Sequence, residues 1–472
     1  MNQDPPSISS SADVFAWLSQ FINLETGRFS TSLRLDRMQA LAHLAGHPER
    51  SAPVIHIAGS KGKGSVTGMI TAMLQAQGFH PARYTSPHVT EYRERITLGN
   101  AFFDEGIYGE AGRELVALEA RLRNSDGIGA EPPAADAREA SFFELLTLYF
   151  FLCARLARCD VMVVETGLGG RLDATNIVDP LVSVITLIER EHTEFLGDHI
   201  GAIAQEKAGI IKPGKPVILA EQCAEALAVF KQTAATCGAP LYYLPEALEL
   251  SSIQVRPQGT SFSVKTKNAP LFPDPLELSI PIPGDIQAQN AALSIAAAKI
   301  AFPALKASSV AQGLGGFTLP ARFERILDDP VFIVDGAHTP HSIESCINTF
   351  SALYGHEGIL IFGCAATKDA RTMAKLLIPH VSRIIITTPG TFKASFPQGV
   401  YDTFAAEAAS QGKQALVSYI PETPEAIERV LALGREARRP LLGTGSFYLA
   451  AELRNTLNSP RSPLKPSVNG GG

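Results

Sequence analysis

The sequence predicts an α/β protein with a mostly parallel sheet, helices on both faces of that sheet, and a second, smaller α/β domain. Short β-branched runs alternate with helical patterns along most of the chain. A Gly-rich turn joins the first such strand to the first amphipathic helix, and the alternation restarts after residue 320. With 472 residues the chain exceeds the roughly 250–300 residues at which single cores stop growing, so two domains are expected.

The first strand, turn and helix are the clearest elements. The strand is the apolar run Val54 to Ala58, and Gly78 lies where the following helix should end. Between them, apolar residues recur at helical spacing: Val66, Met69, Ile70, Met73 and Leu74. The continuous apolar runs 161–164 and 181–185 are typical of central strands that are buried on both faces.

The pattern changes after residue 250. Residues 253–283 alternate in polarity and contain several prolines, which predicts a small antiparallel appendage. A helix is expected near Gln287 to Ala301, and the Gly-rich stretch that follows is interpreted as a linker. We therefore expect a first domain at 1–312 and a linker at 313–320.

The second domain is expected at 321–458. Its predicted strands are Val331 to Val334, Ile359 to Phe362, Ile384 to Ile386 and Leu441-Leu442, with helical patterns between them, as in a Rossmann-like domain. Residues 124–137 are interpreted as a flexible surface loop and 459–472 as a disordered tail.

Composition excludes several function classes. The net charge of -6 and the lack of long Lys/Arg runs argue against nucleic acid or an anionic membrane as a partner. The polar N-terminus does not resemble a secretion signal, and the strongest candidate span, Phe142 to Ala157, is interrupted by Glu144 and Arg155. We expect a soluble, cytoplasmic monomer. Six scattered cysteines predict buried, reduced thiols rather than disulfides or a zinc site.

The turn after the first strand has the composition of a phosphate-binding loop. It consists of Gly59, Ser60, Lys61, Gly62, Lys63, Gly64 and Ser65. Glycines let backbone N–H groups turn inward, the helix N-terminus adds positive potential, Lys63 can reach the β- and γ-phosphates, and Ser65 can bind Mg²⁺. A flexible basic turn is the alternative. It would not explain why the loop joins a buried strand to an amphipathic helix.

A series of motifs along the chain shares the order found in one family. They are Gly59 to Ser65, Thr85 to His88, Glu165 to Asn176, His192 to Gly197, Ala204 to Lys212, Gln287 to Ala291, Arg322 to Glu324 and Asp335 to His338. In this order the chain resembles folylpolyglutamate and dihydrofolate synthases of the Mur ligase superfamily. The resemblance implies a P-loop-type ATP-binding first domain.

The resemblance also implies a metal site. Glu165, Ser86 and His192 match Mg²⁺ ligands of the family, which uses two ions, and Mg²⁺ prefers oxygen ligands that it shares with phosphates. The alternatives are an exposed strand-end glutamate and a surface imidazole. Lys207 would ordinarily be a solvated helix lysine. In the family this lysine is carbamylated and becomes an anionic metal ligand, so we expect the same modification at Lys207.

Four residues match positions that the family uses to hold ATP. The resemblance places Asn290 at the adenine edge, Arg322 at the phosphates, Asp335 near the ribose, and His338 at the phosphates or the reacting centre. A surface ion pair for Arg322 and a turn role for Asp335 are the alternatives. Three departures from the family pattern are Ser60-Lys61 for Thr-Asn, Thr339 for Asn, and Ala321 for Gly.

The implied reaction is ATP-dependent addition of L-glutamate to a folate, or to dihydropteroate, through an acyl phosphate. Lys63, Lys207 and His338 are the expected catalytic residues, and both family activities stay open. A cell-wall Mur ligase would need a further domain before Gly59, where only 58 residues stand. A P-loop NTPase with a non-folate role would not require the Lys207 and Asp335 to His338 motifs. A non-catalytic nucleotide-binding module would lack one of the metal ligands, and none is missing from the sequence.

Overall fold

The structure is a computed structural model that describes residues 7–23, 34–124, 139–190, 197, 199–268, 271–390, 395–413 and 416–458. The chain divides into two compact units. The first comprises Met1–Ile253, Ser261–Ile280 and Gln287–Phe317, and the second comprises Gln254–Thr260, Pro281–Ile286 and Thr318–Gly472. The predicted loop beyond Asn124, the predicted tail 459–472 and His192 all lie outside the described residues.

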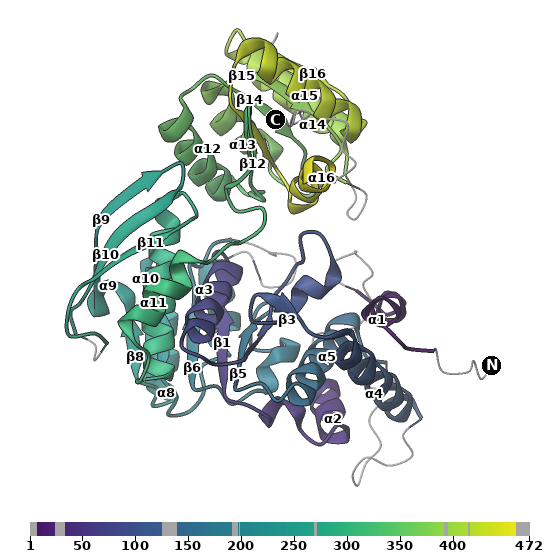
Figure 1. The fold of residues 1–472 in the computed structure, drawn as a ribbon, viewed down its shortest axis with the longest axis vertical. Helices are drawn as coiled ribbons and strands as arrows, with labels where there is room; N and C mark the ends of the chain where they lie inside the picture. Colours follow the sequence, from purple (N-terminus) through teal and green to yellow (C-terminus); the bar gives the residue numbers. More distant parts are fainter. Residues whose placement is uncertain are drawn as a thin grey trace, which may run out of the picture. The chain divides into compact units, whose positions relative to one another are not determined.

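The first unit contains an eight-stranded sheet (Figure 1). Its strands are β1 (Val54–Ala58), β2 (Pro81–Tyr84), β3 (Ile96–Leu98), β4 (Ala101–Phe102), β5 (Val161–Glu165), β6 (Val182–Ile185), β7 (Val217–Leu219) and β8 (Leu241–Tyr243), in the spatial order β4-β3-β2-β5-β1-β6-β7-β8. The six strands β2-β5-β1-β6-β7-β8 pair in parallel. Strands β3 and β4 extend the β2 edge in antiparallel pairing. The predicted mostly parallel sheet is confirmed.

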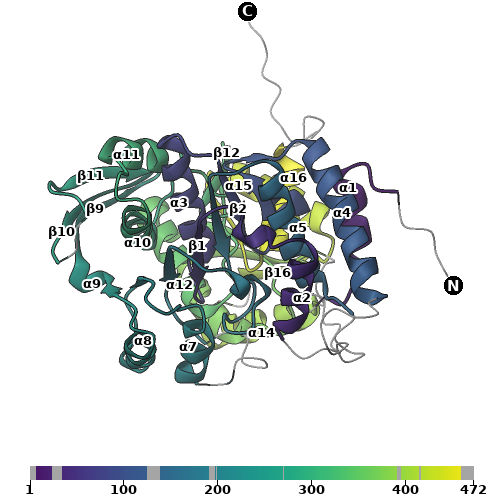
Figure 2. The same cartoon turned by 90° about the horizontal axis from the view of Figure 1, so that it is seen from below.

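Helices cover both faces of this sheet (Figure 2). Helix α3 (Lys63–Ala76) packs on β1, β2 and β5, and α11 (Ala307–Gly315) packs on α3. The other helices of the unit are α1 (Ser11–Leu18), α2 (Asp36–Leu44), α4 (Glu105–Arg123), α5 (Phe142–Leu156), α7 (Ile200–Ala208), α8 (Ala224–Thr236), α9 (Leu244–Ala247) and α10 (Asp285–Ala301), with short 3₁₀ turns η2 (Pro48–Arg50), η3 (Tyr92–Arg95) and η5 (Ala174–Ile177).

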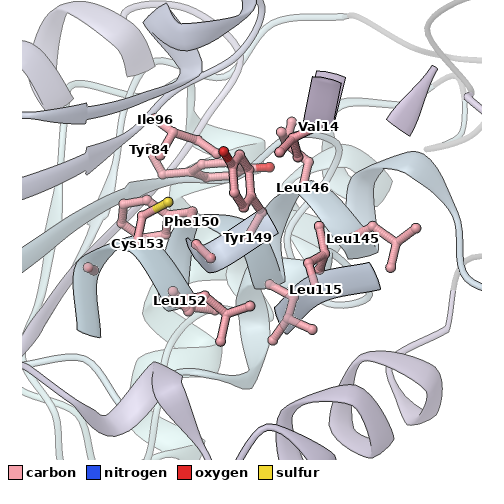
Figure 3. Close-up of a cluster of buried hydrophobic side chains, with 14 of the residues drawn as sticks. Val14, Tyr84, Ile96, Leu115, Leu145, Leu146, Tyr149, Phe150, Leu152 and Cys153 are labelled. Atoms are coloured by element: carbon pink, nitrogen blue, oxygen red, sulfur yellow. The ribbon is translucent and has the colours of Figure 1, made fainter. Parts of the chain in front are cut away.

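The main core of the first unit lies between the sheet and α4 and α5. Figure 3 shows Tyr149, Phe150 and Cys153 of α5 packed with Tyr84 and Ile96 of the sheet. Fully burying one such aromatic or aliphatic side chain contributes about 1.5–3 kcal/mol. The apolar run considered as a membrane span is thus a core helix. In the described part of the chain, no helix is both long and apolar enough to cross a membrane.

A small antiparallel sheet of three strands follows, as predicted. Its strands are β9 (Leu248–Arg256), β10 (Gly259–Thr266) and β11 (Leu276–Ile280), in the order β11-β10-β9. After it, α10 begins at Asp285, close to the predicted start. Within the stretch interpreted as a linker, Gly313 to Gly315 form the end of α11.

The second unit contains a six-stranded mixed sheet (Figure 1). Its strands are β12 (Glu324–Asp328), β13 (Val331–Val334), β14 (Gly358–Phe362), β15 (Val381–Ile386), β16 (Val417–Tyr419) and β17 (Leu441–Thr444), in the order β12-β13-β17-β14-β15-β16. All but β12 are parallel. The helices are α12 (Pro340–Tyr354), α13 (Ala370–Leu377), α14 (Pro397–Ser410), α15 (Thr423–Ala437) and α16 (Phe447–Asn458), with the 3₁₀ turn η6 (Ile378–His380). All four predicted strands are present.

The cysteines depart in part from expectation. All six are free, and four are buried: Cys153, Cys159, Cys346 and Cys364. Cys237 is half-buried, and Cys223 is exposed. The prediction of buried thiols is therefore wrong for Cys223, because this residue lies directly before α8 on a polar surface turn rather than inside an apolar run.

Candidate active site

Glycine shapes the loop between β1 and α3. Gly59 has φ +144°, and a Cβ atom there would lie 1.9 Å from Oγ1 of Thr186. Gly62 has φ +89°, and its Cβ atom would lie 2.5 Å from Oδ1 of Asn290. Both positions need a positive φ and a close approach, so a side chain would displace the loop. The backbone N–H groups of Ser60 and Lys61 donate to the carbonyl oxygen of Leu187, which fixes the loop beside β6.

Two lysine amines meet at this loop. The Nζ atoms of Lys63 and Lys207 each lie 2.8 Å from the carbonyl oxygen of Gly59 and donate to it. Lys207 is 1% exposed, although it belongs to α7 in a part of the chain that reads as an ordinary amphipathic helix. The alternative of a solvated lysine is therefore wrong. The carbonyl oxygen of Gly59 thus accepts from both lysine side chains, one from the β1–α3 loop and one from α7.

Glu165 ends β5 next to the loop and is 2% exposed. A Cβ atom on Gly64 would lie 3.6 Å from Oε2 of Glu165, so the bare start of α3 makes room for this carboxylate. Ser65 is buried in the first turn of α3, and Ser86 follows β2, the neighbour of β5. The alternative of an exposed strand-end glutamate is wrong.

These oxygen donors fit Mg²⁺ that is shared with phosphates. Among the described residues, no group of three or more His, Cys, Asp or Glu side chains is arranged to hold a metal ion alone. One carboxylate with Ser65 and Ser86 suits an ion that takes its other ligands from phosphate and water. An unmodified Lys207 amine does not fit as a ligand, whereas a carbamate would. The predicted ligand His192 lies outside the described residues.

A series of buried hydrogen bonds holds the segment that follows Glu165 in place. His56 of β1 contacts Thr175 through Nε2 and Oγ1 at 2.8 Å, and the Thr175 hydroxyl donates to Asp173 at 2.5 Å. The other carboxylate oxygen of Asp173 accepts from the N–H groups of Gly167 and Leu168. Burial, and after it the nearby Lys212 cation, lowers the pKa of His56 to about 3. His56 is therefore neutral at physiological pH.

Three predicted residues of the second unit form a group of their own. The guanidinium of Arg322 lies 4.6 Å from the centre of the Phe447 ring, and the His338 ring lies 5.7 Å from the same ring. The Nδ1–H of His338 donates to the carbonyl oxygen of Gly336 at 2.8 Å. A Cβ atom on Gly336 would lie 2.4 Å from the Phe447 ring, so this glycine lets the strand end approach the aromatic side chain.

Asp335 holds the turns of this group together. Its carboxylate accepts from the N–H groups of Phe323 and Ala337, both at 2.8 Å. Burial raises its pKa, and the nearby Arg322 cation opposes that rise. The turn role considered for Asp335 is thus present in the fold, and contact with a ribose stays a prediction. Thr339, which replaces the family's Asn, caps α12 together with Ser342.

The comparisons with known proteins agree with this geometry. Residues 57–298 match the Mur ligase middle domain, and residues 321–447 match the Mur ligase glutamate ligase domain. The chain is 31% identical over 437 residues to the dihydrofolate synthase/folylpolyglutamate synthase of Bacillus subtilis, covering 91% of this chain and 96% of the relative. The chain belongs to the folylpolyglutamate synthase/dihydrofolate synthase family.

Two further members of the folylpolyglutamate synthase/dihydrofolate synthase family are similar along their whole length. The folylpolyglutamate synthase of Lacticaseibacillus casei is 30% identical over 433 residues, which cover 90% of this chain and 95% of the relative. The structure of Mycobacterium tuberculosis folylpolyglutamate synthase complexed with ADP and AMPPCP superposes with a TM-score of 0.83 at 26% identity, covering 95% of this chain and 98% of that one.

Sequence reasoning brought together the glycine loop, Lys207, Glu165 and Asn290, but it missed several of their neighbours. Thr186 directly follows β6 and lies against Gly59. Phe447 begins α16 and contacts both Arg322 and His338. Neither lies in a motif used for the resemblance. A polar residue directly after a buried strand is the one signal that singles out Thr186.

Proposed function

We propose that this family member uses ATP to join the amino group of L-glutamate to a carboxylate of a folate. The carboxylate oxygen attacks the γ-phosphorus of ATP, ADP leaves, and an acyl phosphate forms. The glutamate nitrogen then attacks the acyl carbon, inorganic phosphate leaves, and the nitrogen loses a proton. The membership of the family and the geometry of the β1–α3 loop support this reaction.

The observation that carries the proposal is the convergence of Lys63, Lys207 and Glu165 on a glycine-shaped loop at a helix N-terminus. Backbone N–H groups, the α3 dipole and the Lys63 amine together favour a triphosphate at this place. Phosphoryl transfer depends mainly on positioning and on charge neutralisation. A cluster of cations with one buried carboxylate beside it provides both.

Each residue of the site has a separate role in the proposed reaction. Lys63 neutralises charge on the β- and γ-phosphates, and Ser65, Ser86 and Glu165 would hold Mg²⁺, which supplies further neutralisation when it is bound. For Arg322 and His338 we keep the expectation of a phosphate contact, and Phe447 packs against the Arg322 guanidinium. Asn290 contributes its amide beside Gly62.

A carbamate on Lys207 would place a negative charge beside the Lys63 amine, because both side chains reach the carbonyl oxygen of Gly59. The modified side chain carries a negative charge, so it would pair with Lys63 and add an oxygen ligand for Mg²⁺. Intact mass spectrometry after incubation in bicarbonate tests this directly. An added mass of carbon dioxide that disappears in Lys207→Ala supports the carbamate, and an unmodified mass together with electron density for a plain amine contradicts it.

Product mass tests the function itself. The purified chain receives ATP, Mg²⁺ and L-glutamate with either tetrahydrofolate or dihydropteroate. Growth of tetrahydrofolate by glutamyl units is the expected result, and conversion of dihydropteroate would add dihydrofolate synthase activity. ATP hydrolysis at a rate independent of both glutamate and the folate, without ligated product, would favour a P-loop NTPase instead.

A further inference from the structure

Arg83 of β2 is a half-buried cation beside the proposed metal site, and no step of the proposed function uses it. In the parallel pairing of β2 and β5, Arg83 lies opposite Val163. Because side chains alternate across a strand, Arg83 and Glu165, two residues beyond Val163, share one face of the sheet. At this diagonal spacing an arginine side chain reaches the neighbouring strand's carboxylate.

Helix α3 covers this face and leaves room for both groups. The Cβ positions of Gly64 and Gly68 lie one helical turn apart. The first is 3.6 Å from Oε2 of Glu165, and the second is 3.6 Å from Nη1 of Arg83. Two glycines on one stripe of α3 therefore accommodate a carboxylate and a guanidinium side by side.

Neighbouring groups fix the guanidinium in place. Nε of Arg83 donates to Oγ1 of Thr97 on β3 at 3.1 Å, and the Thr97 hydroxyl donates onward to the carbonyl oxygen of Gly99. Arg83 and Thr97 are direct partners in the β2–β3 pairing. The anchored Nε atom leaves the Nη groups directed toward α3.

Burial lowers the pKa of Arg83, and two nearby carboxylates oppose that effect. The guanidinium interacts electrostatically with Glu165 and with Glu94. Glu94 in turn accepts from the N–H groups of Val89, Thr90 and Glu91, and so it closes the turn that follows the segment with Ser86. One half-buried cation thus lies on β2, next to the β5 strand that ends with the proposed Mg²⁺ ligand Glu165.

We propose that Arg83 is a positioning residue that holds the Glu165 carboxylate as a counter-ion before a divalent cation binds, and that its charge weakens the binding of that cation. The inference rests on the proposed function, because it assumes that Glu165 is a metal ligand. A fixed positive charge beside a carboxylate repels a divalent ion most strongly where water is excluded. Metal therefore binds well only together with the phosphates of the nucleotide.

The test measures Mn²⁺ binding to the nucleotide-free, full-length chain by the electron paramagnetic resonance signal of free Mn²⁺. Arg83→Met keeps the length of the side chain and removes its charge, so Mn²⁺ should bind about tenfold more tightly than to the wild type. Arg83→Lys keeps a cation and should bind Mn²⁺ as the wild type does. Loss of packing alone would not tighten metal binding.

The matched control is Arg93→Met. Arg93 is a half-exposed cation of the same unit that pairs with Glu91 and Glu105 rather than with Glu165, so this variant makes the same change in net charge at a different ion pair. Because salt screens exposed charges, it should alter Mn²⁺ affinity by less than about twofold. The urea unfolding curve of each variant, followed by the fluorescence of Trp17, verifies that the first unit is folded.

Glu165→Gln separates the two possible failures. If it leaves Mn²⁺ binding unchanged, Glu165 is no ligand and the metal site of the proposed function is wrong. If Glu165→Gln weakens binding while Arg83→Met binds as the wild type does or more weakly, the inference about Arg83 alone is overturned.

Discussion

In the first unit, glycine gives the turn after β1 its shape, whereas in the second unit alanine and phenylalanine adopt the same kind of backbone conformation before β12. Gly59 and Gly62 have positive φ angles and closely approach Thr186 and Asn290. Ala321 and Phe323 have φ of +54° and +46°, where side chains are disfavoured.

The difference teaches how each unit maintains its site. In the first unit glycine adopts the positive φ at little cost in free energy, and the loop is held by its fit against neighbouring side chains. In the second unit a disfavoured conformation persists because Asp335 accepts from Phe323, and Gly336 donates to the carbonyl oxygen of Ala321. Substitutions in the two turns should therefore have opposite effects.

The largest effect is expected at Lys63, the cation that the glycine loop presents. Lys63→Ala should lower the rate of ATP-dependent ligation by a factor of about 10²–10³, because it removes charge neutralisation at the transferred phosphoryl group. Steady-state product formation measures the loss. The control Lys231→Ala removes an exposed lysine that pairs with Glu246 and should keep the wild-type rate. Near-normal ligation by Lys63→Ala would contradict the role of the loop.

Gly59→Ala tests the fit of the loop against Thr186. The new methyl group would lie 1.9 Å from Oγ1 and 3.0 Å from the backbone nitrogen of Thr186, so the first unit should lose about 2–4 kcal/mol of stability. Gly214→Ala is the matched control, because Gly214 also has positive φ but nothing within 4 Å, and should cost about 1–2 kcal/mol. Urea unfolding followed by Trp17 measures both. Equal losses would show that backbone strain alone acts at Gly59.

The buried His56 side chain makes the stability of the first unit depend on pH. Its pKa is about 3 in the folded state and 6.5 ordinarily, so below pH 6.5 the unfolded chain binds a proton that the folded chain does not. Stability is therefore lost as the pH falls, by about 2 kcal/mol at pH 5 from this group.

His56→Gln keeps a polar partner for Thr175 and removes this titration. The variant should lose less stability than the wild type between pH 7 and pH 5, by about the same 2 kcal/mol. Urea unfolding of the first unit at both pH values measures the difference through Trp17. An identical pH dependence in the two proteins would show that His56 is not held neutral.

The smallest effect is expected at Ala321 in the second unit. Ala321→Gly removes the penalty of a positive φ but adds chain entropy to the unfolded state, so a net gain of about 0.5–1 kcal/mol is expected. Differential scanning calorimetry measures it. Ala321→Ser retains the disfavoured conformation and should give no gain. A loss of stability in Ala321→Gly would contradict the contrast between the two turns.

The sequence predicted the strands of the sheets better than it predicted the side-chain contacts of the candidate site. Runs such as Val161 to Val164 and Val331 to Val334 signal strands because burial on both faces demands continuous apolar residues. The glycine loop was equally visible. Arg83 and Phe447 were not, because their roles depend on register and on helix placement rather than on local pattern. Only the family's glycine at this position signals the positive φ of Ala321, and the burial of Lys207 became evident only from the packing of α7.

The transfer of oxygen between substrate and phosphate tests the central claim most directly. The folate or dihydropteroate carboxylate is labelled with ¹⁸O, and the inorganic phosphate formed with ATP and glutamate is analysed by mass. Attack of the carboxylate on the γ-phosphate predicts that each phosphate released during ligation carries one labelled oxygen. Unlabelled phosphate accompanying ligated product would contradict an acyl phosphate and the account built on it.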